Sequence, residues 1–426
     1  MARVGFRLLL AFLMFTAMWI YVQRVLIPHQ GNEGVIRQIP RGNLSDLYPR
    51  WLGARELLLH HRDPYRADIT REIQVGYYGR PLDPGRPNDP RDQQAFAYPV
   101  YVVLLLAPTV TLPFATVHRL SFWIFLSLTV ISIPLWMQTL RWRVSKISLA
   151  IWVLLTLSCF PAIQALKLQQ LTILVAALVA GSTTALVHRR YVLAGILLAI
   201  ATIKPQLVIL VFVCALIWVF GAWRERQRFF WSFAITSCVL VLAGQFLLPG
   251  WITEFRGAMR SYSDYTGGGN LLLDLLPSPL GQIASVSVVA VLLVLAWRNR
   301  HADQESLAFQ WLLCTALATT LLVIRFSPYN ELLLLPAAMI ALRAGEQIWR
   351  SSPVSRFLFS IAAVSILWPY IAAACLVLAL ALLPAWRVQN SWELPFYATF
   401  AVPVIVYGLL FASKNVLVNS DHKASQ

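Results

Sequence analysis

The sequence predicts an all-α polytopic membrane protein that forms one integral membrane domain over residues 1–426, and three observations carry this prediction. Hydrophobic residues make up 58% of the chain and charged residues only 13%, which is about half the charged fraction of a soluble domain. Many apolar runs approach or exceed the roughly 17–25 residues that cross a bilayer as a helix. Short basic clusters also alternate with connections that carry no basic excess, as in the positive-inside pattern.

The net charge of +16 would suggest nucleic acid as a partner if the chain were soluble. Here the basic residues cluster between apolar runs, at 141–146, 189–190, 224–228, 298–300 and 343–356. We therefore assign these connections to the cytoplasm and find no nucleic-acid-binding motif with interleaved aromatic residues. The five cysteines lie inside apolar runs without metal-ligand spacing, so we interpret them as packing residues.

The apolar runs predict about twelve transmembrane helices in a plasma or inner membrane, with both termini cytoplasmic. The first run resembles a signal peptide but lacks a small-residue cleavage site, so we expect it to remain as a span. The run 356–385 is overlong and contains Pro369, which predicts a kink or a steep tilt. If this run formed two short spans, the C-terminus would lie outside. The predicted spans are 7–27, 117–139, 147–166, 169–187, 191–204, 205–222, 229–248, 281–297, 305–324, 331–343, 356–385 and 394–412.

Two long polar connections are predicted on the extracytoplasmic face. Residues 28–94 form the first loop, in which acidic and basic residues nearly balance. Residues 249–280 form the second loop, with Gly267–Gly269 as a turn. Between them, residues 96–113 are apolar but interrupted by three prolines, and we expect a re-entrant or membrane-surface segment rather than a span.

Asp46 opens a predicted amphipathic helix in the first loop, in the stretch SDLYPRWLGARELLLHHRDPY at residues 45–65. With Ser45 as the N-cap, Asp46 lies in the first turn, where the helix dipole favours an anion. The apolar stripe of this helix predicts that it rests on the membrane surface. By itself the stretch favours a structural role, in which Asp46 stabilises the helix start or pairs with Arg50 one turn on.

Cations at the outer ends of three helices indicate a different kind of role. Lysine near hydrocarbon is costly, so Lys204 either faces a cavity or partner, or reaches the headgroups. Lys167 and Arg325 lie at two further outer ends, against the cytoplasmic bias of the other basic residues. Together the three cations predict a site for a lipid phosphate on the outer leaflet. Polar neighbours that would bind hydroxyl groups are Gln169, Gln170, Tyr329, Asn330 and Glu331, although capping a helix is the simpler role for Asn330.

Several motifs of soluble enzymes are absent from the sequence. It contains no Walker A sequence, no Rossmann glycine fingerprint and no HExxH. The sequence therefore gives no support for ATP as an energy source or for a nucleotide-sugar site of Rossmann type.

The chain resembles glycosyltransferase family 87, whose members have the GT-C architecture. The resemblance lies in five stretches between residues 45 and 336: SDLYPRWLGARELLLHHRDPY, FAYPVYVVLLLAPTVTLP, KLQQLTILVAALVAG, LAGILLAIATIKPQLVILV and RFSPYNELLLLPA. Each is weak alone, and their order and spacing carry the likeness. Members often have histidine near the outer segment that contains Ser-Pro, whereas this chain has Tyr329-Asn330 after Ser327-Pro328. This departure would fit another sugar or acceptor.

The resemblance implies a GT-C-type bundle that transfers a hexose, mannose foremost, from a polyprenyl-phosphate sugar to a lipid or glycan acceptor on the extracytoplasmic face. Asp46 would be the catalytic general base, and transfer would invert the anomeric centre. Lys204, Arg325 and Lys167 would bind the donor phosphate, and the five polar neighbours would bind substrate. No cofactor and no metal are expected, because the lipid-linked sugar is itself a substrate and protein cations stand near its phosphate.

Two other classes of function remain open on the sequence. A lipid or lipid-linked-sugar transporter, such as a flippase, would use the first loop as a gate and Lys204 as part of a pathway. A membrane scaffold would need no site, and the outer cations together with Asp46 argue against it.

Overall fold

The computed structural model describes residues 2–39, 44–83 and 85–419, and throughout these residues the chain is helical with connecting turns and no strand. The predicted all-α class is confirmed. Small parts of the predicted first loop, residues 40–43 and 84, and the C-terminal residues 420–426 lie outside the described residues.

Twenty-two α-helices and six short or irregular helical segments follow one another in the described residues. Their bounds are α1 (Ala2–Tyr21), η1 (Val22–Leu26), α2 (Ile27–Ile36), α3 (Leu47–His60), α4 (Ala67–Tyr78), α5 (Val102–Leu106), η2 (Ala107–Thr109), α6 (Phe114–Thr139), α7 (Lys146–Ser158), α8 (Phe160–Lys167), α9 (Thr172–Val187), α10 (Tyr191–Ile200), η3 (Ala201–Ile203), α11 (Pro205–Gly221), α12 (Trp223–Leu247), α13 (Trp251–Thr266), α14 (Leu271–Leu275), α15 (Leu280–Arg298), α16 (Leu307–Val323), η4 (Pro328–Leu334), α17 (Leu335–Arg343), α18 (Gly345–Ser351), α19 (Pro353–Ala379), α20 (Ala385–Gln389), η5 (Leu394–Phe396), η6 (Thr399–Ala401), α21 (Val402–Ala412) and α22 (Lys414–Asn419).

Six helices in the described residues are long and apolar enough to cross a membrane, and eight if each of two bent helix pairs counts as one span. The bent pairs are α7 with α8, at 59°, and the Pro328–Arg343 helix with α18, at 69°. Four further apolar helices, α9, α10 with η3, α11 and α16, are only 10–17 residues long. The chain is therefore a multi-pass helical membrane protein, while the number of twelve spans stays a prediction. The overlong run near Pro369 is one helix, α19.

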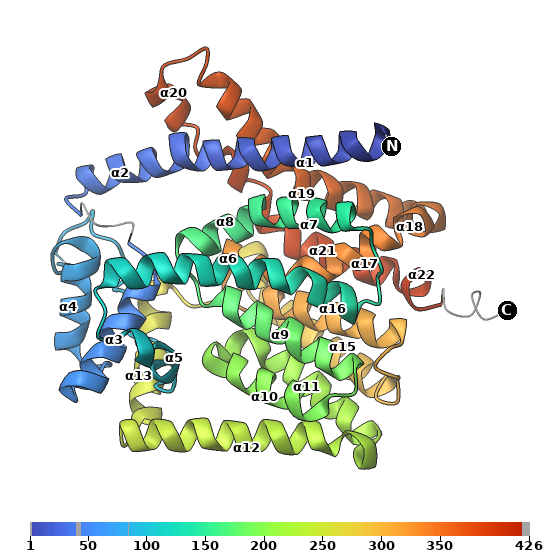
Figure 1. The fold of residues 1–426 in the computed structure, drawn as a ribbon, viewed down its shortest axis with the longest axis horizontal. Helices are drawn as coiled ribbons and strands as arrows, with labels where there is room; N and C mark the ends of the chain where they lie inside the picture. The colour runs from blue at the N-terminus through green and yellow to red at the C-terminus, as the bar shows by residue number, and fades with distance from the viewer. Residues whose placement is uncertain (1, 40–43, 84, 420–426) are drawn as a thin grey trace.

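The long helices α1, α6, α12 and α19 run along the length of the molecule in Figure 1. Helices α3, α4 and α13 gather at one end of this bundle, which we call the loop end. The start of α1 and the helices α18 and α22 lie at the opposite end. The two predicted polar loops thus come together at one end of the bundle, away from both ends of the described chain.

Close helix packing in the interior depends on small residues, as at Gly195 on α10. A Cβ added there would lie 2.5 Å from the backbone oxygen of Phe229 on α12. Glycine at this position lets the two helix backbones approach closely, as small residues do between membrane helices.

The first loop packs into the main core, which changes one prediction. Leu47, Trp51 and Ala54 on α3 are buried in the large hydrophobic cluster, and Trp51 Nε1 donates to the backbone oxygen of Thr109 at 3.1 Å. The apolar stripe of α3 therefore faces protein, and the prediction that it rests on the membrane surface is wrong. Residues 96–113 cover part of this stripe, and α5 within them has five residues, too few to cross a bilayer.

Candidate active site

The backbone around Asp46 is held by the turn that follows α8. The Asp46 N–H donates to the Leu168 carbonyl at 2.8 Å. Ser45 Oγ accepts from the Leu47 N–H at 3.0 Å and donates to Leu168 O at 3.4 Å. Asp46 occupies the N-cap position of α3, yet its side chain makes no capping hydrogen bond. Since the Ser45 hydroxyl serves the helix start, the Asp46 carboxylate is left for other contacts.

Two side chains from distant elements donate to the Asp46 carboxylate. The Tyr77 hydroxyl on α4 donates to Oδ1 at 3.2 Å, and Gln170 Nε2 donates to Oδ2. Arg50 lies one turn along α3, and its guanidinium donates to the Asp46 backbone oxygen at 2.7 Å. The predicted pairing of Asp46 with Arg50 is thus a hydrogen bond from the Arg50 guanidinium to the Asp46 backbone, and the Arg50 charge lies near the carboxylate. Stabilisation of the helix start does not account for these carboxylate contacts.

The surroundings of Asp46 suit a proton acceptor. Burial raises the pKa of the Asp46 carboxyl above its ordinary value, and the Arg50 charge opposes this rise. The Tyr77 hydrogen bond also acts to lower the pKa. A general base works best when its pKa approaches the working pH, so a raised pKa favours proton uptake from a hydroxyl.

Lys204 is buried at the break between η3 and α11. Its backbone has φ −124° and ψ 78°, and Pro205 begins the next helix. Only 6% of its surface is exposed. Its ammonium donates to Gln170 Oε1 and to Thr172 Oγ1, both at 2.8 Å. Lys204 therefore faces partners inside the protein, and it does not reach the headgroups.

Gln170 joins the two charged groups of the site. Its amide nitrogen donates to Asp46 and its amide oxygen accepts from Lys204. The neighbouring Gln169 has a positive φ of 50°, and its amide donates to the backbone oxygen of His118 on α6. Consecutive glutamines thus point in different directions, one into the site and one into a packing contact.

The η4 segment supplies further contacts to Lys204 and to its partner Thr172. Asn330 Oδ1 accepts from Thr172 Oγ1 at 3.0 Å, which extends the network beyond Lys204. The Lys204 ammonium also lies 5.2 Å from the centre of the Tyr329 ring. Asn330 lies inside η4, whose N-cap is Ser327, so the predicted capping role of Asn330 is wrong.

Three predicted site residues have their described contacts elsewhere. Lys167 donates to Gln30 Oε1 on α2, and the Asp46 charge acts on it. Arg325 is exposed, and its charge acts on Tyr262 of α13. Glu331 lies next to Asn330 in the chain but lines a separate cavity.

Sequence reasoning missed several members of the network. Tyr77, Thr172 and Tyr98 were not singled out, and Arg50 was considered only as a helix-pairing partner. The guanidinium of Arg50 stacks 4.6 Å from the centre of the Tyr98 ring. The Lys204 ammonium lies 5.8 Å from the same ring. The available signal was the aromatic segment FAYPVY at residues 96–101, in which the Tyr98 ring lies near both cations.

In the ranges that the structure covers, no group of three or more His, Cys, Asp or Glu side chains is placed to hold a metal ion.

Comparison with known proteins places the chain in a family. No curated protein and no solved structure matches it. The model of glycosyltransferase family 87 matches residues 96–328, more than half of the 426 residues. Gln170, Lys204 and Arg325 lie within this match, while Asp46 and Tyr77 precede it. The chain belongs to glycosyltransferase family 87 and is a membrane glycosyltransferase.

Proposed function

We propose that the protein transfers a hexose, with mannose as the first candidate, from a polyprenyl-phosphate sugar to a hydroxyl of a lipid or glycan acceptor. The observation that carries this proposal is the single Gln170 amide that contacts both Asp46 and Lys204. A carboxylate and a cation that are joined through one amide supply the two charges that glycosyl transfer from a phosphate requires. One accepts the proton of the attacking hydroxyl, and the other balances the charge on the leaving phosphate.

The step balances with these groups alone. Asp46 accepts the proton of the acceptor hydroxyl as its oxygen forms a bond to the anomeric carbon. The bond from that carbon to the phosphate oxygen breaks, and the electron pair leaves with the polyprenyl phosphate. Attack from the side opposite the phosphate inverts the anomeric centre. Asp46 later returns its proton to solvent.

The cations near Asp46 fit the departing phosphate. Lys204 is buried, where a charge acts more strongly than in water. Arg50 Nε is also buried and has no hydrogen-bond partner in the described part of the chain. It therefore has a donor to offer a phosphate oxygen. We include Arg50 with Lys204 as the main phosphate contacts and keep Arg325 and Lys167 as outer ones. With two cations present, the proposed reaction uses neither a metal nor a cofactor.

The remaining site residues have defined parts in this proposal. Tyr329 and Asn330 lie against Lys204 and Thr172, where sugar hydroxyls would meet them. Gln170 holds Asp46 and Lys204 in place, while Gln169 packs against α6 through the His118 backbone and takes no direct part in the reaction.

We also propose an orientation of the protein in the membrane. The loop end, with α3, α4 and α13, faces the extracytoplasmic side of a plasma or inner membrane, and both termini are cytoplasmic. The shorter apolar helices would complete twelve membrane segments in a GT-C-type arrangement. The gathering of both polar loops at one end supports this orientation.

Asp46→Asn in the purified protein tests the proposal. The amide cannot accept the proton, so turnover of polyprenyl-phosphate mannose with a lipid acceptor should fall by about 10²–10⁴-fold. Asp68→Asn is the matched control, because Asp68 lies in the same loop, is exposed and pairs with Arg62 at 3.2 Å. Unchanged turnover in a folded Asp46→Asn variant would remove Asp46 from the mechanism. Movement of labelled lipid across vesicles without a new glycosidic bond would instead favour a transporter.

A further inference from the structure

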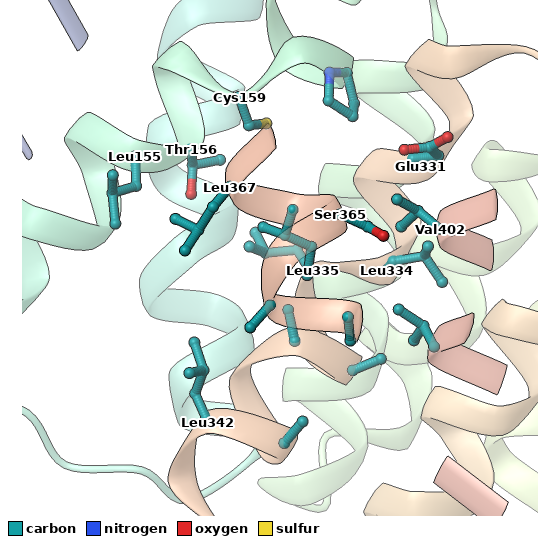
Figure 2. A pocket seen from close by; sticks show the side chains of 18 of the residues that line it. Leu155, Thr156, Cys159, Glu331, Leu334, Leu335, Leu342, Ser365, Leu367 and Val402 are labelled. Carbon is teal, nitrogen blue, oxygen red and sulfur yellow. The ribbon is translucent and has the colours of Figure 1, made fainter. Parts of the chain in front are cut away.

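An apolar cavity lies beside the candidate active site. Its volume is about 460 Å³, within the range of roughly 300–1,000 Å³ typical of ligand pockets. Helices α7, α17, α19 and α21 provide its walls, which are almost entirely apolar. In Figure 2, Cys159 and Glu331 lie toward one end of the cavity and Leu342 toward the other. A cavity of this volume with apolar walls is suited to a hydrocarbon chain.

Two buried polar atoms in this cavity have no hydrogen-bond partner among the described residues. Glu331 is 7% exposed, and its Oε1 makes no hydrogen bond with any described residue. Thr156 is 3% exposed, and its hydroxyl is likewise unpaired within the described chain. Buried polar groups are normally hydrogen-bonded, and leaving one unpaired is costly. A ligand that carries hydroxyl groups would satisfy both atoms.

The cavity reaches the surface that faces the bilayer. Leu342, Ile366 and Leu367 line it and are 56%, 39% and 44% exposed. They belong to apolar helices whose exposed side chains meet hydrocarbon in a membrane. A lipid chain can therefore enter sideways from the membrane without crossing the loop end.

The Glu331 end of the cavity adjoins the candidate active site. Glu331 follows Asn330 in η4, and Asn330 accepts from Thr172, which in turn accepts from Lys204. One short segment thus separates the apolar cavity from the Asp46 network. A lipid with its chain in the cavity would hold its head group next to η4.

Charge decides which lipid substrate fits. A donor lipid ends in a phosphate, and the described residues that line the cavity include no lysine or arginine, so a phosphate held there would be buried without a compensating charge. The cations lie on the other side of η4, at Lys204 and Arg50. A neutral head group rich in hydroxyls would instead donate hydrogen bonds to Glu331 Oε1. This favours an acceptor lipid over the donor lipid.

We propose that this cavity binds the hydrocarbon chain of a hydroxyl-bearing acceptor lipid, with Glu331 and Thr156 holding its head group. The proposal rests on the proposed glycosyl transfer and names the acceptor class: a glycolipid, rather than a free glycan.

Photo-crosslinking tests chain binding without turnover. The full-length protein is labelled in nanodiscs with a long-chain alkyl mannoside that carries a diazirine in its chain. A polyprenyl phosphate with the same diazirine is the comparison, and labelled peptides are identified by mass spectrometry. We expect the mannoside to label α17 and α19, and the polyprenyl phosphate to leave them unlabelled.

Filling the cavity should abolish this labelling. Ala363→Phe places a ring in the cavity from α19 and should reduce mannoside labelling by about tenfold or more, equivalent to at least about 1.4 kcal/mol of binding. Ala338→Phe fills it from α17 and serves if the first variant does not fold. Val364→Phe is the matched control, because Val364 is the next residue and is 63% exposed. It should label like the unchanged protein.

The role of Glu331 is tested by comparing crosslinking of the mannoside with that of its permethylated form, whose head group has no hydroxyl to donate. Glu331→Leu removes the acceptor oxygen and should abolish the preference for the mannoside over its permethylated form. Glu331→Gln keeps an acceptor oxygen and should retain the preference. Thermal melting establishes that each variant is folded.

Three results would overturn the inference: equal mannoside labelling in both cavity-filled variants, cavity labelling by polyprenyl phosphate, or an unchanged preference in Glu331→Leu. Asp46→Asn separates this inference from the proposed function. It should remove turnover and leave crosslinking intact, so failure of either proposal is seen independently of the other.

Discussion

Two buried cations lie near opposite ends of α11 and differ in what surrounds them. Lys204 precedes the helix and Arg226 follows it, and the 17 residues of α11 separate them by about 25 Å at the rise of a helix. Both are almost fully buried, with 6% and 4% of their surfaces exposed. Burial alone therefore does not distinguish them.

Their partners do. The Arg226 guanidinium donates to three backbone carbonyls, those of Trp218 at 2.7 Å, Arg300 at 2.9 Å and Ala302 at 3.0 Å. It ties the turn between α11 and α12 to the connection between α15 and α16. Lys204 donates only to side chains, and one of these, Gln170, contacts a carboxylate. A cation held by carbonyls joins elements together, whereas one held by movable side chains near a carboxylate can serve chemistry.

Between these two cations, the larger expected effect on turnover is at Lys204. Lys204→Met removes the charge that would balance the leaving phosphate, so turnover should fall by about 10²–10³-fold. Initial rates at saturating donor, together with a melting curve, measure this. A folded variant with ordinary turnover would contradict the role of Lys204 and erase the difference between the two cations.

Arg226→Met should lower stability and leave turnover nearly unchanged, the reverse of the effect expected for Lys204→Met. Leaving its carbonyl partners unpaired should lower the free energy of unfolding by about 3 kcal/mol. Turnover per folded molecule should stay within about twofold of the unchanged protein, because nothing in the site contacts Arg226. The melting temperature in detergent and the rate per folded protein are both needed. A large loss of rate without a loss of stability would show that Arg226 belongs to the chemistry.

Gln170→Leu tests the link between the charges. The substitution keeps both charges but removes the amide that positions them, so we expect about a tenfold loss of turnover, equivalent to about 1.4 kcal/mol. Gln169→Leu is the matched control, since Gln169 donates to the His118 backbone instead. Equal losses in the two variants would indicate that the turn, rather than the Gln170 amide, matters.

Tyr77→Phe should have the smallest effect and concerns pH. The Tyr77 hydrogen bond lowers the pKa of Asp46, so removing it should raise that pKa further. A base must be deprotonated to act, so turnover is lost as pH falls through this pKa. The acidic limb of the pH–rate profile should therefore move to higher pH in Tyr77→Phe, by about half a unit. A limb that stays in place or moves to lower pH would show that Tyr77 does not act on Asp46.

The site was only partly predictable, and particular residues show why. Asp46 and Lys204 stand out because charged groups are rare in this chain and costly near hydrocarbon. Tyr77 and Thr172 do not stand out, since tyrosine and threonine are ordinary in helices of this kind. The sequence points to the glutamine pair, but choosing between Gln169 and Gln170 requires the direction of each side chain. Glu331 follows Asn330 in the chain, yet the turn of η4 places it in the apolar cavity.

The sequence by itself determined that this chain is a multi-pass helical membrane protein of glycosyltransferase family 87. Apolar content, run length and motif order are properties of the chain and need no folding to be seen. The tertiary structure alone decided that residues 46, 77, 170, 204 and 330 meet, and that α3 faces protein. These contacts join residues that are 31 to 158 positions apart in the chain, and they arise from the packing of α3, α4, α9 and η4 around the break at Lys204. Packing of this kind depends on the shapes of all the helices together, which no local pattern encodes.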